Sequence, residues 1–273
     1  MPEPLFASRT VLVTGATDGI GYETARDLVF AGATVILHAR NREYGEDTIA
    51  RLVKLGAEPL RLHLLVADFT RLREVTELAE QVSDAVPTLD VLVNNAAVAG
   101  PRQRTLTEDG NELTFQVNYL APYLLTRALS GMIATARGRV VNVSSALHRG
   151  GRVDWADPTR ARNYTPLAVY AQSKLALTMF TRGLAEFSPR ALTAVSVHPG
   201  VFDTALLPMY GRIGRPACEA APHIVRLCAP KTAVVNGGYY EQDEAVAPAE
   251  LVDNPRARAR LSRLSGQLAD ITA

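Results

Sequence analysis

The sequence predicts an α/β fold in which one doubly wound parallel sheet is flanked by helices. Short β-branched runs recur along the chain, with longer amphipathic stretches between them, and this alternation is typical of a parallel sheet. The runs are almost continuously apolar, as expected for strands that are covered on both faces. Because no Ser/Gly-rich linker or run of charge suggests a boundary, we expect one domain over residues 1–273.

The expected elements follow this alternation in chain order. Strands are expected at 10–13, 34–37, 60–66, 91–93, 139–143 and 193–197, with a weaker one at 238–241. Helices are expected at 19–31, 42–55, 71–85, 107–135 and 167–187. The last helix carries Leu177, Phe180, Leu184 and Phe187 on one face. That stripe serves either as core or as a subunit interface, so a homodimer or homotetramer is expected.

Two segments interrupt the alternation. Residues 146–166 are expected to form an inserted loop, and the proline-rich residues 202–230 a substrate-binding segment or lid. Long irregular segments inside an α/β domain are usually functional.

The composition excludes several classes of protein. The 273 residues are 47% hydrophobic, which excludes a disordered chain, and a formal net charge of +1 gives no bulk attraction to nucleic acid. No apolar run is long enough to span a membrane, and residues 1–4 lack the layout of an export signal. We therefore expect a cytoplasmic protein without a membrane anchor. Cys218 and Cys228 match no metal-ligand spacing, so we expect two small buried hydrophobes and no metal site.

A glycine-rich loop, Thr14–Gly21, joins the first expected strand to the first expected helix. Gly15 allows a tight turn, Gly19 lets the backbone approach a pyrophosphate, and Gly21 lets the helix pack against the strand. The helix N-terminus then offers unpaired N–H groups to the anion. The loop predicts dinucleotide binding, the alternative being a glycine-rich turn without a ligand.

The end of the second expected strand bears on the choice of cofactor. An acid there would bind the ribose 2′-OH of NAD, but this strand runs into His38-Ala39-Arg40-Asn41. Arg40 is suited to a 2′-phosphate, so we expect NADP(H) rather than NAD(H); the alternative, a solvated surface charge, leaves the missing acid unexplained. Asp68, after the third strand, could accept a bond from the adenine amino group or cap the next helix.

Tyr170 and Lys174 lie four residues apart at the start of the expected helix 167–187, so they share one face. The ordinary pKa of tyrosine is about 10, and a neighbouring cation favours the phenolate. The pair could therefore do acid–base chemistry. Polar residues at the expected strand ends face the same crevice of a doubly wound sheet, or serve as caps and turns. They are Asn94, Asn95, Ser144 and Ser145, with Asn118 in the helix between them.

The order and spacing of these motifs resemble the short-chain dehydrogenase/reductase family over nearly the whole chain. The motifs that carry the resemblance are Thr14-Gly-x-x-x-Gly-x-Gly21, Asn94–Ala97, Asn118, Ser144-Ser145, Tyr170-x-x-x-Lys174 and Pro199-Gly200. Val141–Ser145 with His148, and Ser196–Gly200, resemble its retinol dehydrogenase and WW-domain oxidoreductase branch.

The resemblance implies a Rossmann-type fold and hydride transfer between NADP(H) and a carbonyl or alcohol. Tyr170 would be the general acid, Lys174 would assist it and bind the nicotinamide ribose, and Asn118 would hold a proton-relaying water. Ser145, or alternatively Ser144, would bind the reacting oxygen. The implied cofactor-binding residues are Gly15, Thr17, Asp18, Gly19, Ile20, Gly21, Arg40, Asn41, Asp68, Phe69, Asn95, Ala96, Ala97, Tyr170, Lys174, Pro199, Gly200, Val201 and Thr204.

One position departs from the family pattern, because Ala97 stands where Asn-Asn-Ala-Gly is usual. The added methyl strains the backbone only if φ is positive there. The branch resemblance implies a small lipophilic carbonyl or alcohol as substrate, for which Trp155, Phe202 and Leu206 are candidate contacts. An alternative from another class is a regulator that senses NADP(H) and does no chemistry.

Overall fold

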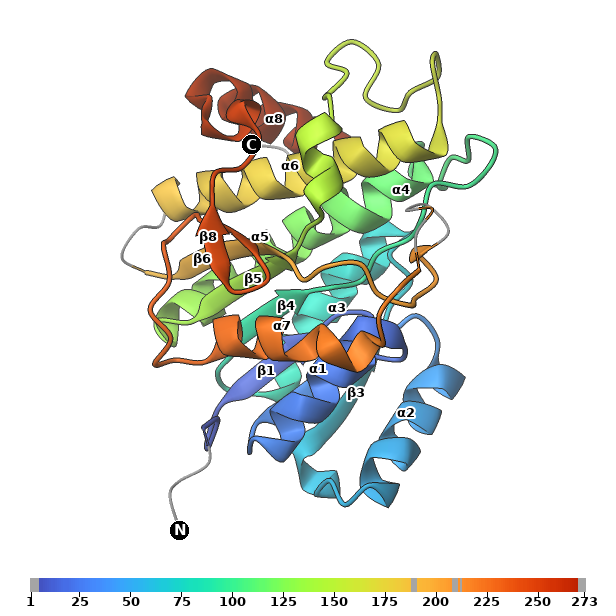
Figure 1. Cartoon of the computed structure of the whole chain (residues 1–273). Helices are drawn as coiled ribbons and strands as arrows, with labels where there is room; N and C mark the ends of the chain where they lie inside the picture. The colour runs from blue at the N-terminus through green and yellow to red at the C-terminus, as the bar shows by residue number, and fades with distance from the viewer. Residues whose placement is uncertain (1–4, 188–190, 208–210, 212, 270–273) are drawn as a thin grey trace.

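The computed structural model describes residues 5–187, 191–207, 211 and 213–269. They form one eight-stranded sheet in the order β3-β2-β1-β4-β5-β6-β7-β8 (Figure 1). Strands β1 to β7 are parallel, and β8 pairs antiparallel with β7. The strands are β1 Thr10–Val13, β2 Thr34–Ala39, β3 Leu62–Val66, β4 Val91–Asn94, β5 Arg139–Val143, β6 Thr193–His198, β7 Tyr239–Glu241 and β8 Glu244–Val246. The doubly wound α/β fold predicted from the sequence is confirmed.

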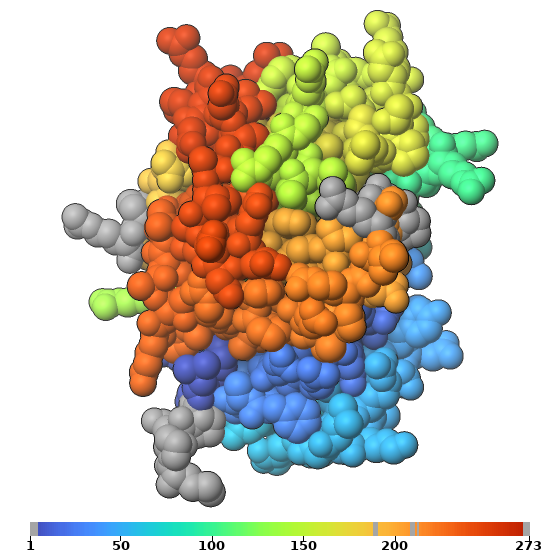
Figure 2. All heavy atoms as spheres, viewed as in Figure 1, coloured from blue at the N-terminus to red at the C-terminus, as the bar shows by residue number. Residues whose placement is uncertain are grey.

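Alternating side chains of the strands build a core on each face of the sheet. Val11 and Val13 face the layer that contains α1 and α7, whereas Leu12 faces α3 and α5. The flanking helices are α1 Gly19–Phe30, α2 Arg42–Lys54, α3 Leu72–Ala85, α5 Ala121–Thr135, α6 Pro166–Phe187 and α7 Ala221–Cys228. In the space-filling view, orange atoms of the C-terminal part lie directly against the blue N-terminal part (Figure 2). Apolar side chains therefore hold the helices on both faces.

A third hydrophobic cluster joins α6 to the C-terminal helix α8, Pro255–Leu268. Leu177 on α6 is fully buried, and Phe180 and Leu184 are partly buried against core clusters. Phe187, at the end of the helix, is 82% exposed. Of the two interpretations of this stripe, core packing accounts for all of it except its last residue.

The largest departures from the prediction are the start of one helix and two elements that were not expected. The helix expected at 107–135 begins only at α4, Leu113–Phe115, and passes through a π-helical turn, Gln116–Leu120, into α5. Gly110 has a φ of 78°, which a helix cannot contain. Strand β8 and helix α8 were not expected, because β8 is short and the arginine-rich α8 has no wide apolar stripe.

Within 202–230, residues of α7 are helical rather than irregular. The expectation that both cysteines are buried is wrong for Cys218, which is exposed just before α7, while Cys228 is buried. None of the described helices is long and apolar enough to cross a membrane. The described residues also contain no group of three or more side chains that could hold a metal ion.

A buried polar network ties the central strands to the helices behind them. Asn94 Nδ2 on β4 donates to Asn142 Oδ1 on β5 at 2.8 Å and to Thr126 Oγ1 on α5 at 2.9 Å. Asn142 Nδ2 in turn donates to Thr181 Oγ1 on α6 at 2.8 Å. Because all four side chains are buried, losing one member leaves unpaired polar groups in the core.

We therefore expect Asn142→Ala to lower the free energy of unfolding by about 1–3 kcal/mol. Urea denaturation followed by circular dichroism measures the change. The matched control is Thr135→Ala at the exposed end of α5, which should change the value by less than about 0.5 kcal/mol. Equal stability of the two variants would show that the network contributes nothing.

Candidate functional site

The glycine loop lies between the ends of β1 and β4. Gly15 and Gly19 have φ values of 64° and 52°, in the region that favours glycine. A Cβ placed on Gly21 would lie 2.0 Å from the carbonyl oxygen of Gly15 and 2.4 Å from Asn95 Nδ2. Asp18, the N-cap of α1, makes no side-chain cap bond. The loop thus leaves the first N–H groups of α1 available to a ligand.

Two side chains hold this loop in place. Asn95 Nδ2 donates to the carbonyl oxygens of Thr14 at 2.9 Å and Gly15 at 3.2 Å. Thr14 Oγ1 accepts bonds from the backbone N–H groups of Asn95 and Ala96 at 2.9 and 3.0 Å. Asn94 points the other way, into the core network described above. The two adjacent asparagines therefore have separate tasks, one in the core and one at the loop.

The loop borders a cavity of about 660 Å³ at the carboxyl ends of the parallel strands. Most of the residues expected at the cofactor line it: Gly15, Thr17, Asp18, Gly19, Ile20, Gly21, Arg40, Asp68, Phe69, Asn95, Ala96, Ala97, Tyr170, Lys174, Pro199, Gly200 and Thr204. Lining residues not identified from the sequence include His38, Tyr44, Arg51, Val98, Val117 and His198. The cavity thus joins the glycine loop to the Tyr170–Lys174 pair.

Two residues expected at the cofactor do not line the cavity. Asn41 caps α2, where its Oδ1 accepts a bond from the Tyr44 N–H at 3.0 Å. The carbonyl oxygen of Val201 accepts a bond from the Arg215 N–H at 3.3 Å. Arg40 does line the cavity, and its guanidinium makes no ion pair with any of the described residues. It is therefore available to an anionic ligand.

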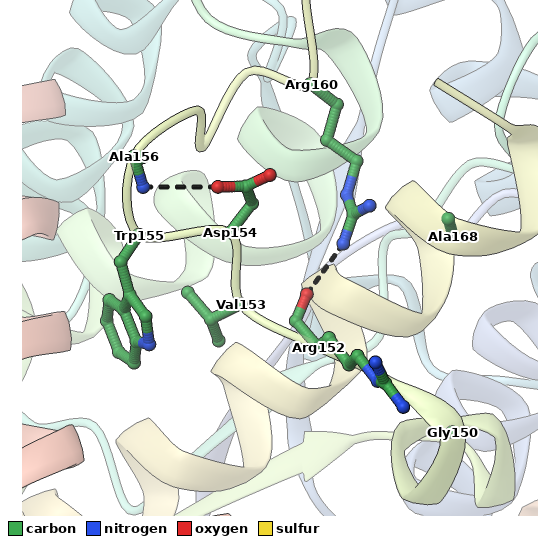
Figure 3. A pocket seen from close by; sticks show the side chains of 8 residues that line it. All are labelled: Gly150, Arg152, Val153, Asp154, Trp155, Ala156, Arg160 and Ala168. Atoms are coloured by element: carbon green, nitrogen blue, oxygen red, sulfur yellow. Dashed lines mark hydrogen bonds between the residues drawn. The ribbon is translucent and has the colours of Figure 1, made fainter. Parts of the chain in front are cut away.

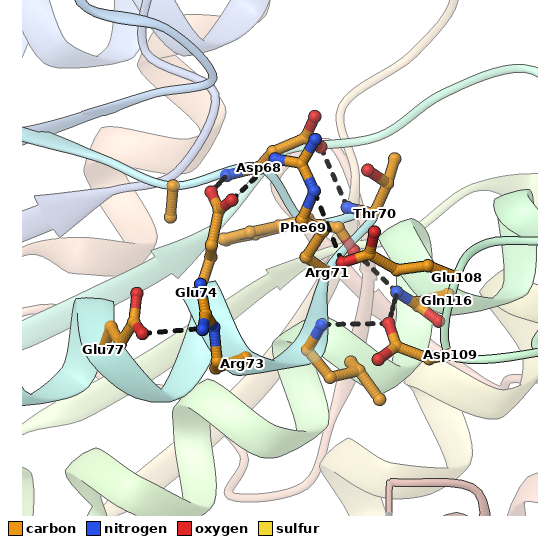
Figure 4. Close-up of polar contacts among 12 residues, drawn as sticks. Asp68, Phe69, Thr70, Arg71, Arg73, Glu74, Glu77, Glu108, Asp109 and Gln116 are labelled. Carbon is orange, nitrogen blue, oxygen red and sulfur yellow. Dashed lines mark hydrogen bonds and ion pairs between the residues drawn. The ribbon is translucent and has the colours of Figure 1, made fainter.

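The loop after β3, Asp68–Thr70, forms the far wall of the cavity and is held by a polar network (Figure 4). Glu74 Oε2 accepts a bond from the Asp68 N–H at 2.6 Å, and Gln116 Nε2 donates to the Phe69 carbonyl at 3.2 Å. The same Gln116 amide donates to Asp109 Oδ2 at 2.7 Å. The cavity wall is thus fixed from both neighbouring helices.

Asp68 was expected either to accept a bond from the adenine amino group or to cap the helix that follows. The structure gives the bond at the start of α3 to another residue. Asp109 Oδ2 accepts a bond from the Leu72 N–H at 3.0 Å at the start of α3. Asp68 Oδ1 accepts one from the Thr70 N–H at 2.9 Å, which shapes the loop itself. Asp68 itself is one of the residues that line the cavity.

His38, at the end of β2, is buried and bonded through both ring nitrogens. Nδ1 accepts a bond from the Gly15 N–H at 3.1 Å, and Nε2 lies 2.9 Å from the Ala67 carbonyl oxygen. The ring stacks on Phe69 with centroids 4.3 Å apart. Burial lowers the pKa of His38 to about 4, so the ring is neutral at pH 7.

At the other end of the cavity, α6 carries Tyr170 and Lys174, both buried. Lys174 Nζ donates to the Val143 carbonyl oxygen at 2.8 Å and lies 5.6 Å from the centroid of the Tyr170 ring. Burial lowers the pKa of Lys174 to about 7. The expected side-by-side placement of phenol and amine on one helix face is found.

Asn118 lies in the π-helical turn between α4 and α5, a distortion frequent at functional sites. Its Oδ1 accepts a bond from the Val98 N–H at 2.8 Å, and its Nδ2 donates to the Val98 carbonyl at 2.9 Å and to Ser173 Oγ at 3.2 Å. The side chain does not line the cavity but holds the backbone of Val98, which does.

The two serines after β5 face different partners. Ser144 Oγ lies 2.7 Å from Thr178 Oγ1 on α6, and Ser145 Oγ accepts a bond from the Leu147 N–H at 3.1 Å. His148 Nδ1 lies 2.8 Å from the Ser145 carbonyl oxygen, and its Nε2 accepts a bond from the Ala249 N–H at 3.1 Å. This neutral histidine therefore braces the Ser145 backbone against the C-terminal segment.

The segment after β6 begins as a loop closed at its base. Phe202 pairs with Arg215 in an isolated bridge, and the Asp203 N–H donates to the Arg215 carbonyl at 2.8 Å. Thr204 Cγ2 lies 3.2 Å from the position that a Cβ on Gly19 would occupy. Phe202, Thr204 and Leu206 line the cavity, while residues 208–210 and 212 lie outside the described part of the chain.

Trp155 lies in a second hollow, of about 500 Å³, formed by residues of the segment 146–166 and Ala168 of α6 (Figure 3). Arg260 of α8 lies over the indole ring at 4.8 Å from its centroid. The structure thus separates Trp155 from Phe202 and Leu206, with which the sequence analysis grouped it.

Ala97 replaces the glycine usual in the resembling family without left-handed strain. It is not among the residues with positive φ, and its methyl lines the cavity. The backbone at position 97 therefore does not need a glycine for its conformation. The added methyl group affects only the space in the cavity.

The doubly wound sheet, with a glycine loop and a cavity at its strand ends, defines a Rossmann-type α/β fold. The model of the short chain dehydrogenase family matches residues 9–211, and the chain belongs to this family. It is 32% identical to retinol dehydrogenase 13 of Homo sapiens over 97% of this chain and 86% of that protein.

Solved structures agree. An uncharacterized protein from Mycobacterium Paratuberculosis has 30% identity and a TM-score of 0.82, covering 98% of this chain and 96% of that one. The Pseudomonas aeruginosa RhlG/NADP active-site complex has 25% identity and a TM-score of 0.70, covering 89% and 98%. The chain is therefore an oxidoreductase of a family that uses nicotinamide cofactors.

Two histidines whose pKa values are lowered, the buried His38 and the half-buried His198, make stability depend on pH. Burial lowers the pKa values of His38 and His198 to about 4, so unfolding takes up protons between pH 6.5 and 4. The free energy of unfolding should therefore fall by about 1 kcal/mol per histidine from pH 7 to pH 5.5. Urea denaturation at the two pH values tests this, and His38→Asn should reduce the fall; an equal fall in that variant would contradict it.

Proposed function

We propose that this protein is an NADP(H)-dependent carbonyl reductase or alcohol dehydrogenase for a small lipophilic substrate. The observation that carries the proposal is that Tyr170 and Lys174 line the same cavity as the glycine loop. When bound, the nicotinamide supplies or takes up a hydride at the substrate carbon. The close approach at Gly21 and the uncapped N-terminus of α1 fit the pyrophosphate of the dinucleotide.

In this proposal, Tyr170 and the side chains near it handle the proton. Tyr170 donates its phenolic proton to the carbonyl oxygen during reduction and takes it back during oxidation. The Lys174 ammonium, fixed 5.6 Å from the phenol ring, favours the phenolate and binds the ribose hydroxyls of the nicotinamide half. Ser145 donates a hydrogen bond to the developing alkoxide oxygen.

Asn118 has a different part from these groups. Its amide is committed to both backbone groups of Val98 and to Ser173, beside Lys174. We assign it the task of keeping the cavity wall and α6 in register, in addition to the water relay that the resemblance implies. Apolar residues that line the cavity, among them Val98, Phe202 and Leu206, support a lipophilic substrate, as does the similarity to a retinol dehydrogenase.

NADP(H) is favoured over NAD(H) because Arg40 follows β2 where an acid would bind a 2′-OH. Arg40 is exposed, lines the cavity and makes no ion pair with any residue that the structure describes. The similarity to a structure solved with NADP adds support.

Arg40→Asp should weaken NADPH binding about tenfold or more, because it replaces a charge-assisted bond with repulsion. NADH affinity should be kept or improved. Fluorescence titration measures both dissociation constants. Arg42→Asp is the matched control, since Arg42 pairs with Glu46 and does not line the cavity. Unchanged NADPH affinity in Arg40→Asp would overturn the assignment of NADP(H).

Tyr170→Phe should reduce turnover by about 10²-fold or more, because it removes the proton donor, and should leave NADPH binding intact. The assay follows NADPH oxidation with a panel of ketones and aldehydes. Tyr164→Phe, in the neighbouring segment and outside the cavity, is the control. NADPH binding by the unaltered protein with no turnover on any carbonyl would favour the sensing regulator instead, and retained turnover in Tyr170→Phe would refute the role of Tyr170.

A further inference from the structure

His38 is an unusual residue at the end of a buried strand. It follows Leu37 and precedes Ala39, both fully buried, and is itself only 3% exposed. A buried imidazole must have partners for both ring nitrogens, because an unmet one costs free energy. The proposed reaction gives this side chain no role, although it lines the cofactor cavity.

The partners of His38 fix its tautomer. The Gly15 N–H can only donate, so Nδ1, at 3.1 Å, must carry the lone pair. The Ala67 carbonyl can only accept, so Nε2, at 2.9 Å, must carry the proton. Asp68 is the charged group that acts most directly on the ring, and burial outweighs it and keeps the ring neutral.

His38 binds the glycine loop through both its side chain and its backbone. Besides the bond to Gly15, its carbonyl oxygen accepts one from the Ala16 N–H at 3.0 Å. Two successive N–H groups of the loop therefore donate hydrogen bonds to the same residue of β2. Gly15, at a φ of 64°, would otherwise have wide conformational freedom, and fixing it before a ligand arrives saves that entropy on binding.

The same ring connects this loop to the opposite wall. It stacks on Phe69 at an interplanar angle of 15°, and its Nε2 holds the backbone of Ala67, one residue before Asp68. Glu74 of α3 and Gln116 hold the Asp68–Thr70 wall from the other side. His38 therefore sets the separation between the glycine loop and this wall.

We propose that His38 is a positioning residue that presets the glycine loop and the Asp68–Thr70 wall for the adenosine diphosphate half of the dinucleotide. The proposal rests on the proposed function for the identity of the ligand. It holds for NADP(H) and NAD(H) alike, because the pyrophosphate and adenine are common to both.

Three substitutions of His38 distinguish the contributions of its two ring nitrogens to NADPH binding. Asn at position 38 keeps an acceptor near the position of Nδ1, Gln keeps a donor near the position of Nε2, and Ala keeps neither. We expect His38→Ala and His38→Gln to weaken NADPH binding by about tenfold, with His38→Asn within about threefold of the unaltered protein. KM for NADPH should follow, with kcat changed less. His63→Asn on the adjacent strand β3 is the control.

Binding is measured by fluorescence titration and stability by thermal unfolding. Equal NADPH affinity in all variants would overturn the proposal, as would losses that follow the melting temperature instead of the retained acceptor.

Nitrogen-15 NMR of the unaltered protein provides a test that does not depend on folded variants. The expected spectrum has His38 protonated at Nε2, with Nδ1 an acceptor whose shift changes on addition of NADPH. A proton on Nδ1, or no response of Nδ1, would overturn the proposal. Failure of the unaltered protein to bind either nicotinamide dinucleotide would refute the proposed function, while the tautomer would still test the loop geometry.

Discussion

The site depends on one close approach, that of α1 to the ends of β1 and β4 at Gly21. The Gly15 carbonyl and the Asn95 amide occupy the space where any side chain at position 21 would lie. This contact brings the N-terminus of α1 against the strand ends, and it lets Asn95, which follows β4, bond both the carbonyl oxygen and the hydroxyl of Thr14 in the loop. Without it, the first N–H groups of α1 would not face the cavity.

Buried polar groups around this contact are bonded to one another, which restricts the conformations of the strand ends. Asn94 and Asn142 join β4 and β5 to the helices behind, while Asn95, one residue on, turns to the glycine loop. Lys174 is buried against the Val143 carbonyl at the end of β5. Since buried polar groups are costly unless bonded, each strand end is held in one conformation.

The two ends of the cavity are built on different principles. At the glycine loop, backbone N–H groups border the cavity and are held by neutral side chains such as His38, which suits a ligand that carries its own charge. At the Tyr170 end, a buried amine whose pKa is lowered to about 7 lies beside a phenol, which suits proton transfer near neutral pH. A net charge of +1 is therefore compatible with the proposed function, because local backbone N–H groups rather than a bulk field would bind the phosphates.

The sequence by itself determined the alternation of strands and helices along the chain, the glycine loop and the spacing of Tyr170 and Lys174. These are local patterns of hydrophobic period and residue spacing. It could not show β8 or α8, whose residues lack a strong apolar period, nor the late start of the helix at Leu113. Only the tertiary structure decided that Asp109 rather than Asp68 caps α3, that Trp155 lies apart from Phe202, and that both nitrogens of His38 are bonded. These are contacts between residues far apart in the chain, and their partners are fixed only when the sheet and its helices pack together.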